Sequence, residues 1–156
     1  MGSDDWLDKL LREKQDRKQA QEDERRLESA RKAKLEALID SYWTTVKAAI
    51  SDMVKKYNQK IQGRGNELYI PHARLDMLVL EKRSSPPARL TVRLLKPTRK
   101  IHCHADFLAT YPDREFQVRV GDADELYMED PSGKAIAKEE IARVMLEHFL
   151  AALQRL

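Results

Sequence analysis

The chain of 156 residues contains a single cysteine and only five glycines, and both shortages exclude classes of site. One cysteine, Cys103, cannot form an intrachain disulfide or a zinc site built from several cysteines, and it fits a reducing compartment, so we expect a cytoplasmic protein. The sequence has no glycine-rich phosphate loop and no G-x-S-x-G motif, which are the short signatures of nucleotide-binding enzymes and serine hydrolases. We therefore expect no enzymatic activity and no cofactor.

Long apolar runs are missing as well. No stretch approaches the roughly 18 to 20 apolar residues that span a bilayer, and the first residues alternate in charge where a signal peptide is apolar. The 29 cationic and 26 anionic side chains nearly cancel, and the net charge of +3 does not by itself indicate a nucleic-acid partner. We expect neither membrane insertion nor secretion.

Proline and glycine are distributed unevenly along the chain. The first 62 residues contain no proline and only Gly2, and Gly63-Arg64-Gly65 ends this stretch. Because proline and glycine interrupt helices, their near absence from this stretch favours a long helix before the boundary. We predict a charged helical extension over 1–26 and a single α+β domain over 27–156, made of a helix (27–62), a sheet (66–136) and a C-terminal helix (138–156).

The helix predicted over 27–62 carries a wide apolar stripe. Its members recur every three or four residues, as expected for one face of a helix: Leu35, Ile39, Tyr42, Val46, Ile50, Met53, Tyr57 and Ile61. The stripe is wider than a coiled-coil seam, which favours packing of this helix against its own sheet.

Strand patterns with a period of two follow the glycines. Leu75, Met77 and Val79 form one predicted core face, and Leu90, Val92 and Leu94 form the next. Further strands are predicted over 100–106, 114–120 and 125–129. The links between them are short, which favours an antiparallel meander of about five strands because parallel pairs need long crossovers. We expect both helices to cover one face of this sheet.

The first candidate surface lies at the N-terminus. Two apolar pairs at i,i+4 spacing, Trp6 with Leu10 and Leu7 with Leu11, precede a segment from Arg12 to Arg26 that has no apolar residue larger than alanine. Acidic residues stand four positions before basic ones along this segment, which favours an exposed helix. We predict a non-enzymatic interaction module in which Trp6, Leu7, Leu10 and Leu11 dock on a partner protein or on a second copy in a homodimer.

A second interpretation is a nucleic-acid-binding domain. The segment from Lys82 to Lys100 has seven cationic residues and no acidic one, and such a run can neutralise phosphates. The candidate contacts are Arg89, Arg93, Arg99 and Lys100. Aromatic residues that stack on bases are not interleaved with these cations, which makes this signal weak.

A third interpretation places a small ligand or a metal on the exposed sheet face. If Cys103 points inward as an apolar core residue, then His102, His104 and Asp106 point outward on the same strand. Imidazole nitrogens bind several transition metals. The sequence identifies no third or fourth ligand, however. Contact with water is enough to explain polar residues on an exposed sheet face, so we assign no metal.

Overall fold

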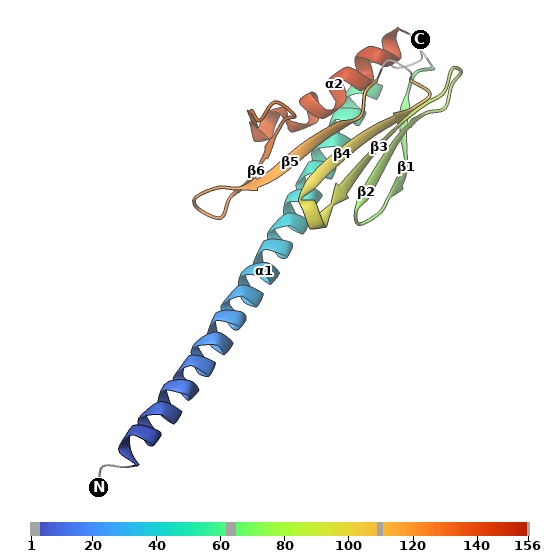
Figure 1. Ribbon diagram of the computed structural model, residues 1–156. Helices are drawn as coiled ribbons and strands as arrows, with labels where there is room; N and C mark the ends of the chain where they lie inside the picture. The colour runs from blue at the N-terminus through green and yellow to red at the C-terminus, as the bar shows by residue number, and fades with distance from the viewer. Residues whose placement is uncertain (1–3, 62–64, 109–110, 156) are drawn as a thin grey trace. The chain divides into compact units, whose positions relative to one another are not determined.

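The computed structural model describes residues 4–61, 65–108 and 111–155. It divides into two compact units, Met1–Leu38 and Ile39–Leu156, which we call the N-terminal unit and the C-terminal unit. The long helix α1 (Asp5–Lys60) contributes to both units (Figure 1). The division predicted between positions 26 and 27 falls inside α1 and stays a prediction.

The N-terminal unit is the first part of α1 and has no core of its own. Every residue from Asp4 to Lys34 is exposed. Asp5 and Asp8 lie in the first turn, where carboxylates interact favourably with the helix dipole. Farther along, the Gln19 amide donates a hydrogen bond of 3.2 Å to the Asp23 carboxylate one turn later. Local interactions of this kind, with the absence of glycine and proline, favour the helical conformation here.

The C-terminal unit contains a single antiparallel sheet whose strands follow one another in chain order. This confirms the α+β class and the antiparallel sheet, but the sheet has seven strands where about five were predicted. The strands are β1 (Leu68–Ala73), β2 (Met77–Lys82), β3 (Ala88–Leu95), β4 (Lys100–Asp106), β5 (Arg114–Val120), β6 (Leu126–Glu129) and β7 (Ala135–Ile136).

The two additional strands lie at the edges of the sheet. β1 contains Pro71, which has no N–H to donate, and its pairing with β2 is interrupted by a register shift between Tyr69 and His72. An edge strand with a bulge is one of the few places where a sheet tolerates proline. β7 has only two residues, so it is too short to give a period-two pattern.

One face of the sheet forms the core. Leu78 pairs with Val92, which pairs with Cys103 on the next strand, and all three side chains are buried. The predicted face of β2 was wrong in its register, because Leu75 lies before the strand and is 88% exposed, although Val79 is buried as predicted. The alternation predicted from Leu75 is shifted by one residue, and Leu78 and Leu80 face the core instead.

Two helical segments cover the core face, as Figure 1 shows for this unit. The buried side chains of the 39–60 part of α1 follow the predicted stripe spacing, and α2 (Ile141–Gln154), after a 3-10 turn at Lys138–Glu140, contributes a second buried row. The Trp43 indole Nε1 donates a 2.6 Å hydrogen bond to the Leu75 carbonyl, and the Arg114 guanidinium donates one of 3.2 Å to the Val144 carbonyl. These contacts fix α1 and α2 to the sheet.

The predicted boundary at Gly63-Arg64-Gly65 lies partly outside the described residues, since the description of the chain resumes at Gly65. Gly65 has a φ of 72°. This left-handed conformation favours glycine, because a Cβ atom would be strained there.

Candidate functional site

The N-terminal unit exposes a cluster of large apolar side chains that we call the apolar tip: Trp6, Leu7, Leu10 and Leu11. Their exposed fractions are 62%, 42%, 53% and 55%. Residues three and four apart lie on one side of a helix, so these four side chains form one patch. Clusters of exposed apolar side chains mark interaction sites more often than single ones do.

Leu27 is the other large apolar side chain that is exposed among the described residues of this unit, at 59%. Position 27 was predicted only as the start of the folded domain, and its exposure was missed. Its separation from Leu11 by a stretch with no apolar residue larger than alanine was the available signal.

The basic segment gains carboxylate and carbonyl partners in the folded C-terminal unit. Arg89 lies 3.8 Å from the Glu81 carboxylate, and Lys100 lies 3.5 Å from that of Glu115. Lys82 is buried at 2% exposure and its ammonium donates to the Pro86 carbonyl at 2.7 Å. The segment from Lys82 to Lys100 contains no acidic residue, but the folded sheet brings acidic residues of neighbouring strands close to it.

The remaining candidate anion contacts do not gather into a basic surface either. The Arg93 guanidinium donates to the Met77 sulfur at 3.5 Å, and Arg99 occupies a turn with a φ of 54°. Charges of both signs alternate across the strands of the exposed sheet face, where Arg89 stands between Glu81 and Asp106. On an antiparallel sheet such opposite-charge neighbours stabilise one another. This face is therefore close to neutral, which weakens the case for phosphate binding.

The histidines of β4 lie on the exposed face, as the register predicted. A carboxylate that the sequence analysis did not connect with them, Asp113, bridges the two rings: its Oδ1 lies 2.6 Å from Nδ1 of His104 and its Oδ2 lies 3.3 Å from Nε2 of His102. The other nitrogen of His104, Nε2, lies 3.1 Å from Asp106 Oδ1. Asp113 was missed because it stands outside the strand, in the turn before β5.

This geometry favours the charged form of His104. An imidazolium donates one N–H to Asp113 and the other to Asp106, whereas a neutral ring presents one lone pair to a carboxylate. The hydrogen bond to Asp113 is the largest cause that raises the pKa of His104 above 6.5, and the same bond lowers the pKa of Asp113 below 3.8. Both ring nitrogens are occupied, so His104 has no lone pair free to bind a metal.

The His104–Asp113 contact predicts a pH dependence with a definite sign. The raised pKa of His104 stabilises the fold at low pH, and this stabilisation is lost as the pH rises through the raised pKa. The lowered pKa of Asp113 stabilises the fold above pH 3.8, and this stabilisation is lost as the pH falls through the lowered pKa. The contact therefore stabilises most between 3.8 and 6.5. In an NMR titration of the histidine ring protons, we expect Asp113→Asn to lower the pKa of His104 and Asp122→Asn, a change in another exposed loop, to leave it unchanged. An unaltered titration in Asp113→Asn would contradict the assignment.

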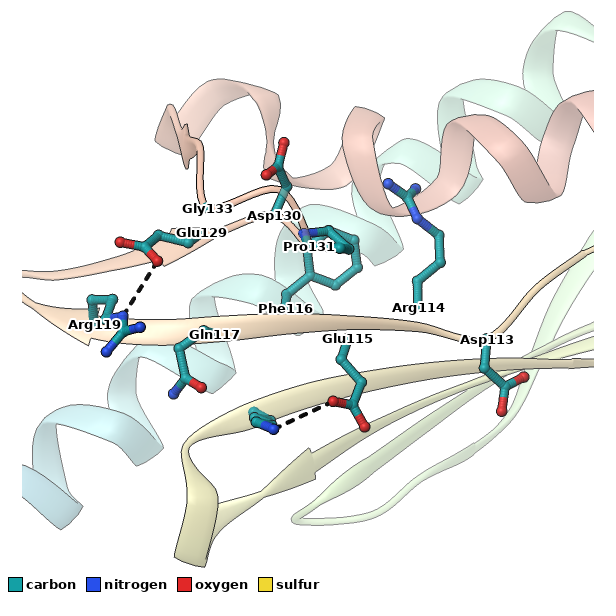
Figure 2. Close-up of a pocket in the computed structure, with 11 residues that line it drawn as sticks. Asp113, Arg114, Glu115, Phe116, Gln117, Arg119, Glu129, Asp130, Pro131 and Gly133 are labelled. Carbon is teal, nitrogen blue, oxygen red and sulfur yellow. Dashed lines mark hydrogen bonds and ion pairs between the residues drawn. The ribbon is translucent and has the colours of Figure 1, made fainter.

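A shallow hollow of about 480 Å³ lies beside these groups, between β5 and the β6–β7 turn (Figure 2). Four of the charged groups that line it form two ion pairs with one another, since Lys100 pairs with Glu115 at 3.5 Å and Arg119 with Glu129 at 3.3 Å. Each pair lies on adjacent strands, and Figure 2 shows Arg119 and Glu129 pointing toward one another. Each of these four charged side chains in the hollow therefore has a partner of opposite charge.

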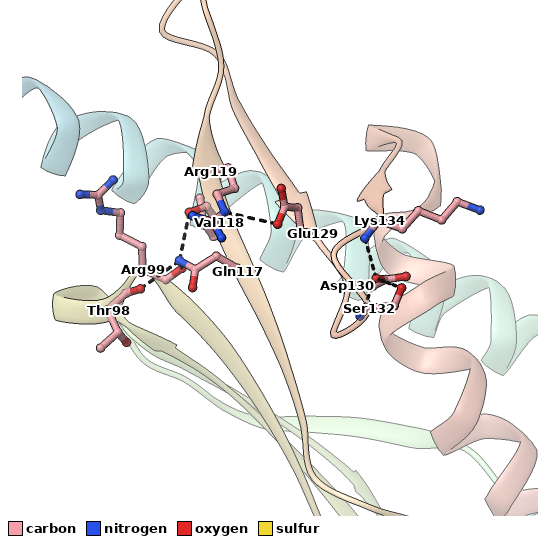
Figure 3. Close-up of polar contacts among 9 residues, drawn as sticks. All are labelled: Thr98, Arg99, Gln117, Val118, Arg119, Glu129, Asp130, Ser132 and Lys134. Atoms are coloured by element: carbon pink, nitrogen blue, oxygen red, sulfur yellow. Dashed lines mark hydrogen bonds and ion pairs between the residues drawn. The ribbon is translucent and has the colours of Figure 1, made fainter.

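The polar side chains next to the hollow hold backbone turns (Figure 3). The Gln117 amide donates hydrogen bonds of 3.0 Å to the carbonyls of both Thr98 and Arg99, which close the β3–β4 connection. Asp130 accepts from the backbone N–H of Ser132 and from that of Lys134, both at 2.9 Å. The positions of Gln117 and Asp130 are therefore explained by their hydrogen bonds to the turns, without a bound ligand.

Cys103 lies on the core face at 0% exposure, which confirms its predicted inward position. Burial raises the pKa of its thiol to about 12. Because the thiolate is the reactive form, this cysteine behaves as a small apolar core residue.

Within residues 4–61, 65–108 and 111–155, no group of three or more histidine, cysteine, aspartate or glutamate side chains is arranged to hold a metal ion. The helices of the same ranges include none with the length and apolar character that crossing a bilayer requires.

Comparison of the chain with protein-family models, with curated proteins and with solved structures finds no match. The functional interpretation therefore rests on the residues and the geometry described above.

Proposed function

We propose that this protein is a non-enzymatic interaction module whose N-terminal unit docks on a protein partner through the apolar tip. The observation that carries the proposal is the exposure of Trp6, Leu7, Leu10 and Leu11 on one side of the first part of α1, where every residue from Asp4 to Lys34 is exposed. An amphipathic helix that lays its apolar residues on a partner helix or groove is a common mode of recognition. The C-terminal unit, with its closed core, serves as the folded base, and we place the protein in the cytoplasm.

The composition of the tip suits an interface. Tryptophan is among the residues enriched at energetic hot spots, and leucines beside it exclude water from the contact. Full burial of a leucine side chain contributes about 1.5 to 3 kcal/mol. Four such side chains in one patch are enough to drive association, whereas the charged segment that follows contributes little affinity because exposed ion pairs are weak.

The two other interpretations have less support. Nucleic-acid binding through Arg89, Arg93, Arg99 and Lys100 requires a surplus of positive charge, and the partners of these residues offset much of it. Ligand or metal binding at His102, His104 and Asp106 requires free imidazole nitrogens, and Asp113 and Asp106 engage both nitrogens of His104. On both of these surfaces, groups that would bind the ligand already have partners within the chain, whereas the apolar side chains of the tip are exposed.

Site-specific photocrosslinking tests the proposal. We expect a photoreactive amino acid in place of Trp6, in the full chain expressed in its native cells, to give one discrete adduct that is lost when Leu10→Ser is added. The same photoreactive group in place of Tyr127, an aromatic residue on the sheet at 36% exposure, is the control and should not give that adduct. The mass of the adduct identifies the class of partner, because a second copy doubles the mass of the chain and another protein adds its own.

The absence of a discrete adduct at position 6, or an adduct that persists with Leu10→Ser, would overturn docking through the tip. An adduct formed equally from positions 6 and 127 would point to nonspecific collision.

A further inference from the structure

The charges of the N-terminal unit are ordered in blocks of alternating sign. Residues 4–33, all described and helical or at the helix start, divide into four consecutive segments of eight, seven, seven and eight residues. Counting Asp and Glu as −1 and Lys and Arg as +1, their net charges are −2 for 4–11, +2 for 12–18, −2 for 19–25 and +2 for 26–33. We call these segments blocks A, B, C and D.

This pattern is complementary to itself only when it is reversed. If two copies lie antiparallel with block A facing block D, then block B faces block C, and each facing pair joins −2 to +2. In a parallel, in-register pair each block faces its own copy, and like charges oppose one another along the whole length. The blocks therefore select the antiparallel orientation, since opposite charges across an interface fix register and orientation.

The same alignment places one pair of exposed leucines opposite one another at each end and Leu11 opposite Arg26. Position i of one copy lies opposite position 37 − i of the other, so Leu10 lies opposite Leu27 and Leu7 opposite Ala30. Trp6 lies opposite Arg31, whose guanidinium can stack on the indole. The five large apolar side chains that are exposed between residues 4 and 38, which are the apolar tip and Leu27, thus fall in blocks A and D. The symmetry of the pair forms this apolar cluster twice, once at each end.

We infer that the partner of the apolar tip is a second copy of this chain, paired antiparallel over residues 4–33. The inference rests on the proposed function and identifies the protein that binds the apolar tip. The overlap is about 45 Å long at 1.5 Å per residue. Two like-charged pairs remain opposite one another, Arg12 with Arg25 and Glu13 with Glu24, so the leucines supply most of the affinity and the blocks supply the orientation.

Leu27 separates this inference from the proposed function. A different protein that binds the apolar tip needs Trp6 and Leu10 but not Leu27, whereas the antiparallel pair needs Leu27 as the surface on which Leu10 packs. We expect Leu27→Ser to weaken self-association of the full chain at least tenfold.

A charge-swap experiment on the full chain tests the orientation. Lys14→Glu with Lys18→Glu changes block B from +2 to −2, and Glu22→Lys with Glu24→Lys changes block C from −2 to +2. In either variant alone, B and C of an antiparallel pair carry the same sign, and we expect the dissociation constant measured by sedimentation in low salt to rise about tenfold or more. In an equimolar mixture both B–C contacts join opposite charges again, and we expect wild-type affinity with native mass spectrometry showing mainly the mixed dimer. Far-UV circular dichroism checks that each variant keeps its helix.

Each outcome distinguishes between the two proposals. Single variants that dimerise as tightly as the wild type, or a mixture that fails to regain affinity, would overturn the antiparallel pairing. A wild-type chain that is monomeric while position 6 crosslinks to a different protein would overturn the self-pairing and leave the proposed function standing. A monomeric chain without any crosslink would overturn both.

Discussion

Leu10→Ser is expected to raise the dissociation constant of the dimer by on the order of a thousandfold. Leu10 is 53% exposed in the single chain, so the main cost of replacing it appears on association. Burial of one leucine contributes about 2 kcal/mol, and the symmetric pair buries two copies, which gives about 4 kcal/mol or nearly three powers of ten. Sedimentation equilibrium over a range of concentrations measures the change.

Leu75→Ser is the matched control for this prediction. Leu75 is the most exposed leucine among the residues that the structure describes, at 88%, and it belongs to the C-terminal unit. The chemical change is the same, but no docking is proposed there, so the dissociation constant should stay within about twofold of the wild type. Equal effects of the two substitutions would mean that the tip is no more than an ordinary exposed surface.

Trp43→Ala is expected to destabilise the C-terminal unit by about 3 to 5 kcal/mol, the usual cost of truncating a buried tryptophan. Trp43 is 2% exposed on the stripe of α1 that packs on the sheet. Its Nε1 also donates to the Leu75 carbonyl at 2.6 Å, in the turn between β1 and β2. Trp43→Phe keeps most of the apolar contact and removes only this bond, so we expect a smaller loss of about 1 to 2 kcal/mol. Urea denaturation followed by circular dichroism measures both.

Thr44→Ala is the control for Trp43, because Thr44 is the next residue of the same helix and is exposed. Its hydroxyl donates only to the Asp40 carbonyl of its own helix at 3.0 Å. We expect a change in the free energy of unfolding within about 0.5 kcal/mol. If Trp43→Ala were as mild as Thr44→Ala, the packing of α1 on the core face would be wrong.

Hydrophobic periodicity predicted most of the fold, because burial imposes it directly. The stripe of the long helix and the alternation of β3 and β4 correspond to buried faces, and Cys103 lies inward as its neighbours required. β2 differs because Leu75, Met77 and Val79 imitate an alternating strand, while pairing with β3 sets the register that buries Leu78 and Leu80. Pattern alone cannot distinguish two registers when apolar residues occupy both faces.

The candidate sites were less predictable, because they depend on residues that are distant in sequence. The segment from Lys82 to Lys100 lacks carboxylates of its own, and the neutralising groups Glu81 and Glu115 come from other positions along β2 and β5. Asp113 reaches His104 across a strand pair for the same reason. The apolar tip was predictable because it depends only on spacing within one helix and on the absence of apolar residues nearby.

The most direct test of the account is the solution mass of the unmodified full chain, measured by light scattering after size-exclusion chromatography over a concentration series. The account predicts a mass near twice the 18.1 kDa of one chain at high concentration, which falls toward 18.1 kDa on dilution. A mass of 18.1 kDa at every concentration would contradict self-association through the N-terminal helix.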